Sequence, residues 1–338
     1  MKRLHRVVAV VVMLGCIAAA SGRPGTAWGD EPAKPTLIRV GIINAASSAT
    51  LWALPTLAKK YNFEVQEATF QRYSDARTAL AAGDIDVANV GPQDIVLALS
   101  QGVKSIVALA GVASGGNCMA VRKGEDVADW AALKGRTIGV GAGSISWLMF
   151  AASVQDNNVD YATLKTVNIV GGGTTYVKAL QDRQIDMMVV WEPFCAMAIN
   201  AGFAQYPTIN HHNSAAFGNI DGVIAATRSF VTKTPDVADR FMQAYVELVT
   251  TFQADKQKWT DLYAQRAGID PKLAAASVQN SRLQYEFSAA QMVKMAKFLA
   301  ASGIAARDVS AELPQYIDYG PLMKATGKTE AQLSAGPQ

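Results

Sequence analysis

The sequence has few of the residues that carry most metal and catalytic chemistry. Only three cysteines and three histidines occur among its 338 residues, and no group of them has the spacing of metal ligands. It also lacks the G-x-S-x-G and H-E-x-x-H motifs and any cysteine with a motif histidine. These absences argue against a metal site and against general-base catalysis by histidine, so we expect no cofactor and no enzyme activity.

Long apolar runs are absent too, apart from one at the N-terminus. Val7 to Ala20 carries no charge, follows a basic start at residues 2–6, and is too short to span a membrane. Small residues and then acidic ones follow it, which is typical of a secretory signal peptide. We expect cleavage after Gly29, or alternatively after Gly22. We expect the protein without residues 1–29 to be exported to the periplasm.

Charge of either sign is scarce, with 17% charged residues in the whole chain. Four basic residues and no acid leave with the leader, so the formal charge falls from +3 to −1, and nucleic acid is not an expected partner. Lipid anchoring at Cys16 is the less favoured alternative, because Leu14 does not suit the position before Gly15. Cys118 and Cys195 remain; they could pair, but we expect two buried, small apolar side chains.

What the chain does contain is a match with itself at a spacing of one hundred residues. The matching pairs are Ile38-Arg39-Val40-Gly41 with Ile138-Gly139-Val140-Gly141, Ala79-Leu80 with Ala179-Leu180, and Ile85-Asp86 with Ile185-Asp186. Any two βαβ segments rich in Ala, Ile and Val share some letters, but here the offset holds over several elements. We therefore expect two similar α/β lobes and a cleft between them, where small ligands bind.

The order of the expected elements indicates how the lobes are built. Apolar strands alternate with helices up to about residue 227, which is typical of doubly wound sheets. After Pro235 the spacing is helical over residues 237–265, 271–280 and 289–302, with few strand formers. We expect a monomer with two lobes: residues 35–117 and 225–338 form lobe 1, and residues 118–224 form lobe 2. Two hinge crossings are expected, near Cys118 and near Val223.

Loops at the ends of the expected strands carry the candidate binding residues. The run from Gly139 to Ser146 leaves a strand and enters a helix, where free amides, partial positive charge and two serine hydroxyls suit an anion. Taken alone, a tight turn with Ser144 as an ordinary helix cap fits equally well, and the spacing is not the dinucleotide G-x-G-x-x-G. The predicted ligand-binding residues are Asn44, Ser47, Ser48, Trp52, Gln71, Gly91, Pro92, Gln93, Asn117, Ser144, Ile145, Ser146, Trp147, Thr174, Thr175, Trp191, Glu192 and Asp221.

Several of these residues have a structural interpretation as well. Trp191 could form a wall of the cleft with Glu192 pairing with an amine or closing the cleft, or both could serve packing and the following helix start. Trp52 and Trp147 stand at helical positions that are more typical of core or cleft edge. Asp221 could contact ligand or cap a turn. The adjacent pair His211-His212 is most typical of a solvated loop.

Several motifs together resemble the periplasmic solute-binding proteins of the nitrate, sulfonate and taurine class of ABC importers, which are related to thiamine-pyrimidine precursor binding proteins. The motifs are Ala79 to Asp86 followed by Val90-Gly91, Leu133 to Val140 leading into Gly143-Ser144, and Trp191-Glu192-Pro193. The resemblance implies a type II, hinge-closing receptor. It would capture a small organic anion, such as a sulfonate, taurine-like compound or carboxylate, for a membrane permease and its ATPase.

One departure from the family pattern favours a more apolar pocket. Many sulfonate binders have another polar residue and a histidine after the Gly-Ser pair, whereas this chain has Ile145-Ser146-Trp147. Two other functions stay open. A thiamine-pyrimidine synthase shares the fold, but it needs a cysteine-rich motif and an active-site histidine, against which the leader and the single Cys195 count. A sensory module could use the same lobes. Arg72 is the one basic residue near the predicted loops.

Overall fold

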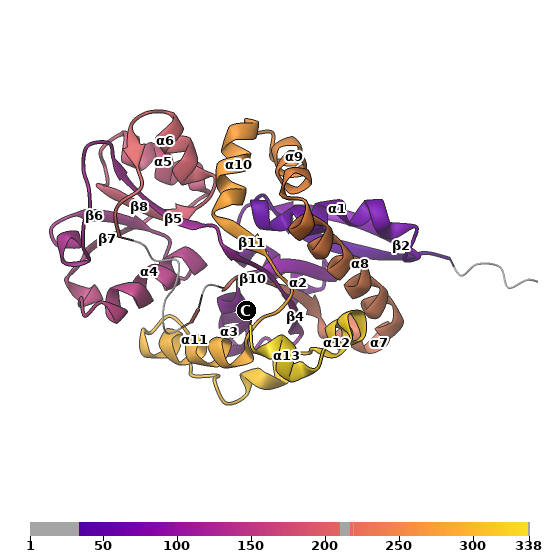
Figure 1. Cartoon of the computed structure of the whole chain (residues 1–338). Helices are drawn as coiled ribbons and strands as arrows, with labels where there is room; N and C mark the ends of the chain where they lie inside the picture. The colour runs from indigo at the N-terminus through magenta and orange to yellow at the C-terminus, as the bar shows by residue number, and fades with distance from the viewer. Residues whose placement is uncertain (1–33, 210–216, 219, 337–338) are drawn as a thin grey trace, which may run out of the picture. The chain divides into compact units, whose positions relative to one another are not determined.

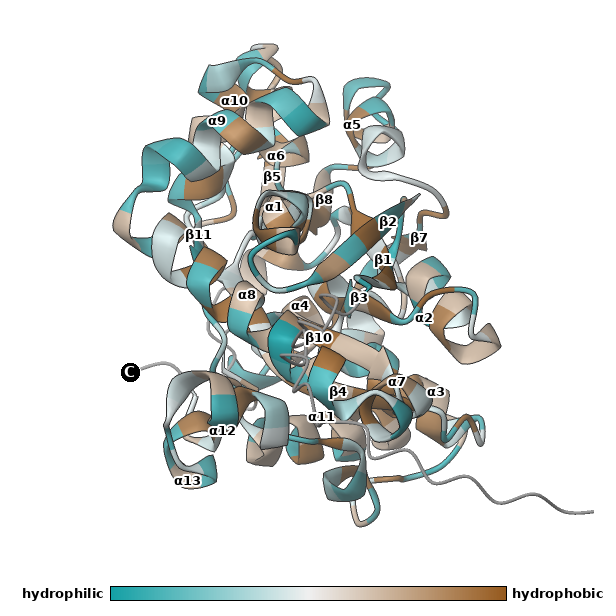
Figure 2. Ribbon diagram, turned by 90° about the vertical axis from the view of Figure 1, so that its right-hand side faces the viewer, coloured by the Kyte–Doolittle hydropathy of each residue, from teal (hydrophilic) through white to brown (hydrophobic). Residues whose placement is uncertain are grey.

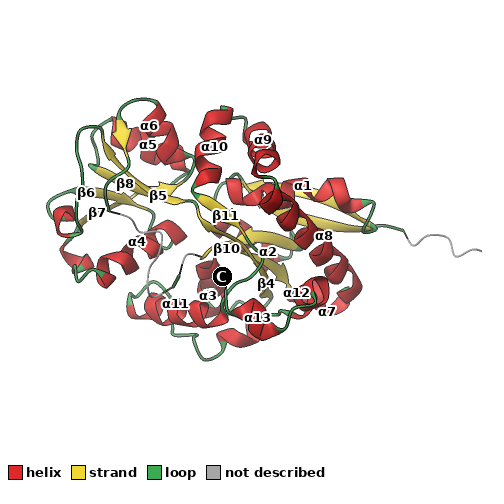
Figure 3. Ribbon diagram, viewed as in Figure 1, coloured by secondary structure: helices red, strands yellow, loops and turns green. Residues whose placement is uncertain are grey.

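Two β-sheets with helices packed around them form the fold of the computed structural model (Figures 1 and 3). The structure describes residues 34–209, 217–218 and 220–336. The predicted signal peptide, Cys16 and the pair His211-His212 lie outside these residues. The predicted α/β class with two sheets is confirmed.

The first sheet has six strands in the order β11-β4-β10-β3-β1-β2. These are β1 (Thr36–Ile43), β2 (Phe63–Phe70), β3 (Val87–Val90), β4 (Ile106–Gly115), β10 (Ile220–Thr227) and β11 (Ser281–Leu283). The second sheet has the order β7-β6-β8-β5-β9. Its strands are β5 (Asn117–Arg122), β6 (Thr137–Val140), β7 (Lys165–Asn168), β8 (Met187–Trp191) and β9 (Ala204–Gln205).

Helices follow most strands and then fill the C-terminal third. Those between strands are α1 (Ala49–Ala58), α2 (Tyr73–Ala82), α3 (Pro92–Ser100), α4 (Ile145–Asp156), α5 (Gly173–Gln181) and α6 (Phe194–Asn200). The later ones are α7 (Arg228–Lys233), α8 (Pro235–Ala254), α9 (Lys256–Ala267), α10 (Pro271–Gln279), α11 (Ala289–Ala301), α12 (Gly320–Thr326) and α13 (Glu330–Ser334). Helix α8 packs on α1, so the two ends of the described chain share one core (Figure 1).

The predicted repeat is present in the structure as a strand order that occurs once in each sheet. Strands β2, β1 and β3 lie side by side in parallel, and β7, β6 and β8 do the same. The third strand of each set then pairs with an antiparallel neighbour, β10 or β5. Because both sets also have a helix after each of their first two strands, the chain contains the same βαβαβ unit twice.

The letter match in the first strand of each unit is out of structural register. Val40 pairs with Val87, and Ile138 pairs with Met187. Because Val87 and Met187 are one hundred residues apart, Val40 is the structural equivalent of Ile138. The structural spacing between β1 and β6 is therefore two residues shorter than the spacing of their identical residues. The glycines confirm this, because Gly41 packs against Ile85 as Gly139 packs against Ile185. The spacing of one hundred residues holds for β3 and β8.

The helical C-terminal region differs from the sequence prediction in one place. The helical spacing predicted one helix over residues 237–265, but the structure has α8 and α9 with a break at Asp255. The Asp255 carboxylate accepts the amides of Gln257 and Lys258, both at 3.1 Å, and thereby starts a new helix. Helices α9 and α10 carry both teal polar and brown apolar residues in Figure 2. In the described part of the chain, no helix is long and apolar enough to cross a membrane.

The prediction that the two remaining cysteines are unpaired is wrong. Cys118 on β5 and Cys195 on α6 form a disulfide with their Cα atoms 6.3 Å apart, and both side chains are buried. The cause is the antiparallel pairing of β5 with β8, which sets Cys118 opposite Val190. The chain then turns directly into α6, and this turn brings Cys195 back over the strand.

Strand β10 bears on the predicted lobe boundary. Val223 lies inside β10, between β3 and β4, so the chain has returned to the six-stranded sheet by Ile220. Residues from Pro35 onward form one unit by their contacts, and both sheets belong to it. The division of this unit into two lobes, with its boundaries, stays a prediction.

Candidate ligand-binding site

A cavity of about 370 Å³ lies where the carboxyl ends of parallel strands from both sheets meet. Ligand sites in open α/β sheets form at these strand ends, as predicted. The six-stranded sheet contributes residues that follow β1, β2 and β3, and the five-stranded sheet contributes residues that follow β6 and β7 or end β8. The volume suits a small organic molecule.

The N-terminus of α4 forms the polar part of the wall from the second sheet. Ser144 is the helix cap, and its hydroxyl oxygen accepts the amide of Trp147 at 3.2 Å. Among the residues that the structure describes, no acceptor is found for the amides of Ile145 and Ser146, and both residues line the cavity. Two free amides at a helix start attract an anion.

A chain of buried hydrogen bonds runs behind this wall from one sheet to the other. The Ser146 hydroxyl donates to the Asn117 side-chain oxygen at 2.6 Å, and the Asn117 amide nitrogen donates to Asp221 at 3.2 Å. The hydroxyl hydrogen of Ser146 is therefore already used. Of the predicted anion donors, the Ser144 hydroxyl hydrogen and the two backbone amides are the groups left for a ligand.

Asp221 is a buried carboxylate in the cavity wall that has no ion-pair partner among the described residues. It is 8% exposed and lies at the start of β10. Burial raises the pKa of its carboxyl to about 7, although hydrogen bonds from Asn117 and Tyr73 act in the opposite direction. Ionisation of this group is therefore unfavourable until a donor or a positive charge reaches it.

A second buried carboxylate, Asp94, is fully engaged by the protein. It accepts the Arg77 guanidinium at 3.1 Å and the Gly91 amide at 3.1 Å, and so fixes the first turn of α3. Burial raises its pKa to about 6, and Arg77 and the Gly91 amide counteract that rise. Its neighbour Gln93 donates its amide nitrogen to Asp94 at 3.2 Å. The Gln93 side-chain oxygen is buried and has no partner among the described residues.

Aromatic side chains form the apolar part of the wall. Trp191 at the end of β8 meets Tyr176 and Phe194 edge-on, with ring centroids 6.2 and 5.6 Å apart. Tyr176 also lies against Gly141, where an added Cβ would be 2.4 Å from the tyrosine hydroxyl, so a larger residue at that position would displace the tyrosine ring. Burial raises the pKa of Tyr176 to about 12, and Arg72 acts against that rise. The wall offers a flat apolar surface beside the free amides.

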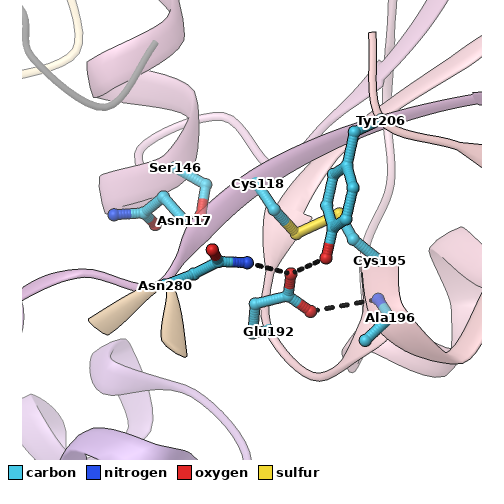
Figure 4. The surroundings of a disulfide bond; sticks show 8 residues. All are labelled: Asn117, Cys118, Ser146, Glu192, Cys195, Ala196, Tyr206 and Asn280. Atoms are coloured by element: carbon cyan, nitrogen blue, oxygen red, sulfur yellow. Dashed lines mark hydrogen bonds between the residues drawn. A yellow bond between two sulfur atoms is a disulfide. The ribbon is translucent and has the colours of Figure 1, made fainter. Parts of the chain in front are cut away.

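Glu192 is held by protein groups rather than left free for a ligand, as Figure 4 shows. Its carboxylate accepts the Tyr206 hydroxyl at 2.5 Å, the Ala196 amide at 3.0 Å and the Asn280 amide at 3.4 Å. Burial raises its pKa, and these three donors counteract the rise. Because Asn280 follows α10, Glu192 joins the end of β8 to the C-terminal helices.

The Cys118–Cys195 disulfide lies beside this carboxylate. Together with Glu192 the two sulfurs have the spacing of a metal site in the part of the chain that is described. Both sulfurs are bonded to each other, however, so they are not free thiolates that could bind a metal.

The structure brings half of the predicted binding residues together around the cavity. These are Ser47, Gln71, Gln93, Ser144, Ile145, Ser146, Trp191, Glu192 and Asp221. They come from strand ends in both sheets, which is what the repeat predicted. Whether each one contacts a ligand stays a prediction.

The other predicted residues lie outside the cavity wall. Asn44, Thr174 and Thr175 are exposed to solvent, and Gly91 and Pro92 are buried at the start of α3. Ser48 accepts a hydrogen bond from Asn89 at 2.9 Å. Asn117 supports the site from behind through Ser146 and Asp221.

The two tryptophans at helical positions belong to the core. Trp52 stacks on Tyr263 with ring centroids 6.2 Å apart, and Trp147 donates its indole N–H to the Tyr161 hydroxyl at 2.8 Å. Both tryptophans are buried away from the cavity wall. The sequence could not place them, because an aromatic residue in a helix has the same local pattern in a core and in a site.

Sequence reasoning missed several residues of the wall, notably Tyr73, Arg77, Asp94, Asn168 and Tyr176. Asp94 could have been predicted from the sequence, because it is an acid in the first helical turn after Gly91-Pro92 and so lies next to the end of a strand. Tyr73 had none, since its role depends on Ser47 and Asp221, which are distant in sequence.

Comparison with known proteins agrees with this geometry. The profile of the NMT1/THI5-like family matches residues 60–250, which is more than half of the chain. The chain therefore belongs to the NMT1/THI5-like family. A protein of Brachyspira hyodysenteriae, named as an ABC transporter periplasmic binding protein, is 24% identical over 275 residues, which are 75% of this chain and 76% of that protein.

Solved structures show the fold. The alkanesulfonate-binding protein SsuA of Xanthomonas axonopodis pv. citri, bound to MOPS, has a TM-score of 0.72 at 16% identity and covers 85% of this chain and 99% of its own. The nitrate-binding protein NrtA of Synechocystis PCC 6803 has a TM-score of 0.70 at 13% identity, with 90% and 91% covered. The chain thus has the periplasmic binding protein fold, and the resemblance predicted from its motifs is confirmed.

Proposed function

We propose that the protein is the solute-binding component of an ABC importer and captures a small organic anion in this cavity. The observation that carries the proposal is the pair of free amides, of Ile145 and Ser146, in the wall of a cavity of about 370 Å³. The amides hold the anionic group at the start of α4, and Trp191 covers the apolar part of the solute. The ABC transporter relative supports a permease and its ATPase as partners.

The mechanism we propose is closure around the solute. The cavity is lined by residues of both sheets, so a solute bound there contacts both and favours the state in which they are closest. This closed state would be what the permease recognises. Export to the periplasm through the cleaved leader belongs to the same proposal.

Binding is favoured over the synthase-like enzyme alternative by the state of the cysteines. Cys195 follows the conspicuous Trp191-Glu192-Pro193 motif, but its sulfur is bonded to Cys118 and is not a free nucleophile or redox thiolate. A sensory module would use the same cavity. A neighbouring gene pair for a permease and an ATPase would favour transport over sensing.

A ligand screen with one pair of variants tests the proposal. Melting temperatures are measured with sulfonates, nitrate, aromatic acids and thiamine-pyrimidine precursors, and the Kd of each hit is then measured by calorimetry. Ile145→Pro removes one free amide at the first position of α4, where proline is tolerated, and Ile145→Val is the control that keeps the amide. We expect binding about tenfold weaker in the proline variant, as for the loss of one charge-assisted hydrogen bond. A screen in which no compound raises the melting temperature would overturn the proposal.

A further inference from the structure

Two glycines join the two sheets, Gly115 at the end of β4 and Gly116 just before β5. Both have positive φ values, +76° and +81°, in the left-handed region that favours glycine. A Cβ added at Gly115 would lie 2.2 Å from the backbone oxygen of Asn280, so the backbone of Asn280 packs directly against this junction. The chain therefore passes from one sheet to the other over two residues with little room around them.

The backbone of Gly116 is hydrogen-bonded on both sides of the junction. Its amide donates to the Asn280 carbonyl oxygen at 2.9 Å, and its carbonyl oxygen accepts the Glu192 amide at 2.7 Å. Asn280 precedes β11, which pairs with β4 of the first sheet, whereas Glu192 follows β8 of the second sheet. A rotation of one sheet relative to the other would therefore move Asn280 relative to Glu192.

The side chains of these two residues also meet across the junction. The side-chain amide of Asn280 donates to the Glu192 carboxylate at 3.4 Å, as Figure 4 shows. Glu192 is 3% exposed and lines the cavity, whereas Asn280 is exposed and lies outside the cavity wall. This hydrogen bond thus links the two sheets through a residue that a solute in the cavity does not contact.

On the side of the second sheet, Glu192 is fixed in place. Its carboxylate also accepts the Ala196 amide at 3.0 Å and the Tyr206 hydroxyl at 2.5 Å. The helix that carries Ala196 is tied to β5 by the disulfide between Cys118 and Cys195. Because the second sheet holds the carboxylate so firmly, loss of its bond to Asn280 would release the first sheet rather than the carboxylate.

We propose that Asn280 is a positioning residue whose hydrogen bond to Glu192 sets the angle between the two sheets, and thereby how far the cavity closes on a solute. A bond to a charged acceptor is stronger than one between neutral groups, so a single contact at the junction can bias this angle. The inference rests on the closure in the proposed function, because it names a contact that fixes the closed arrangement.

Spin labels across the cavity test the proposal without any solute. Thr78 on α2 and Lys178 on α5 are exposed and stand on equivalent helices of the two units. Each is replaced by cysteine and labelled without reductant, so that the native disulfide stays intact, and pulsed EPR gives the distance distribution between the labels. Asn280→Asp sets a second carboxylate against Glu192. At about pH 8 we expect the population at the wild-type distance to fall about tenfold or more relative to the rest, because like charges in contact repel.

Matched variants separate this effect from a general change in charge or folding. Gln279→Glu adds the same charge one residue away, at an exposed position, and is expected to keep the wild-type distribution. Asn280→Ala removes the donor without adding charge and should shift the distribution by less; it replaces Asn280→Asp if that variant does not fold. Asn280→Asp/Glu192→Gln exchanges donor and acceptor, so the distribution should return toward that of the wild type.

Three results would overturn the inference. They are an unchanged distribution in Asn280→Asp, an equal shift in Gln279→Glu, and a shift in Asn280→Asp that Glu192→Gln does not reverse. Since no solute is used, each of these results leaves the proposed function to the ligand screen, and a failed screen leaves this measurement intact.

Discussion

At the scale of single residues, three buried acids around the cavity differ in what surrounds them. Asp94 has an arginine and a backbone amide, and Glu192 has three neutral donors. Asp221 has two neutral donors and faces the cavity. The first two acids are satisfied by the protein and hold the walls in place. Asp221 has fewer donors than Glu192 and no ion-pair partner among the described residues, so its charge is the least compensated of the three when it ionises. Such poorly compensated groups are common where a residue serves function rather than stability.

The stability of the ligand-free protein should therefore depend on pH through Asp221. Its folded pKa of about 7 lies above the ordinary value of 3.8, so its favourable contribution is complete below about pH 4 and is lost as the pH rises through 7. Asp221→Asn removes this dependence. Urea denaturation should give similar unfolding free energies for variant and wild type at about pH 4, and a variant more stable by at most about 4 kcal/mol at about pH 8. An equal difference at both pH values would contradict this.

The tryptophans allow a second prediction at the same scale. Trp191→Ala removes the apolar wall and should weaken solute binding about tenfold or more, while Trp147→Phe leaves the cavity unchanged. Trp147→Phe loses the hydrogen bond to Tyr161 and should cost about 1 kcal/mol of unfolding free energy. Calorimetry and urea denaturation of both variants check this. A large loss of affinity in Trp147→Phe would show that the assignment of Trp147 to the core rather than to the cavity wall is wrong.

The sequence alone could not distinguish all residues of the cavity wall from residues of the core. A tryptophan at the end of a strand followed by proline pointed to the site, and Trp191 is there. Trp52 and Trp147 stand in helices, where the local pattern does not say which face turns to the cavity. Tyr73 was missed because its position beside Asp221 depends on the pairing of β10 with β3, which no local pattern encodes.

At the scale of elements, the internal repeat explains where the site is. Two parallel three-stranded units end in loops, and the loops of both line the cavity. Alternation of strands and helices was predictable because buried parallel strands are continuous apolar runs. Strands β9 and β11 were not predictable, since segments of two and three residues are too short to show any period.

Equivalent glycines in the two units should respond alike to substitution. A Cβ at Gly41 would lie 2.5 Å from Cδ1 of Ile85, and one at Gly139 would lie 2.6 Å from Cδ1 of Ile185. Gly41→Ala and Gly139→Ala should each cost about 1–3 kcal/mol through overpacking. Ile85→Val removes the clashing methyl group. The double variant Gly41→Ala/Ile85→Val should therefore lose less unfolding free energy than the sum of the losses in the two single variants. Additive effects in urea denaturation would count against the clash with Ile85, and unlike costs of the two glycine variants would count against the equivalence.

The disulfide should stabilise the five-stranded sheet by linking β5 to α6. It joins residues 77 positions apart. For such a separation, the lower chain entropy of the cross-linked unfolded state predicts a stabilisation of about 4.5 kcal/mol. Cys118→Ser/Cys195→Ser should lose about 2–4 kcal/mol in urea denaturation, and wild-type protein unfolded under reducing conditions should match it. Detection of two free thiols in unfolded, non-reduced wild type would contradict the bond. The pairing was not predictable from two cysteines alone, because it depends on the register of β5 with β8.

At the scale of the whole molecule, the account joins two walls of unlike chemistry into one site. Free amides at α4 face a cavity whose other wall carries Asp221 and Gln93. Glu192 connects the end of β8 to Asn280 and so ties the cavity to the C-terminal helices. The family and the fold were predictable from short motifs. The chemistry of the solute was not, since it depends on which side chains remain unpartnered after folding.

A crystal structure of the protein purified without refolding tests the central claim most directly. The account predicts density for one small solute in the cavity, with its anionic group within hydrogen-bond distance of the amides of Ile145 and Ser146. Its other end should lie against Trp191 and Asp221. Density for a tightly bound solute elsewhere on the protein, with this cavity empty, would contradict the account.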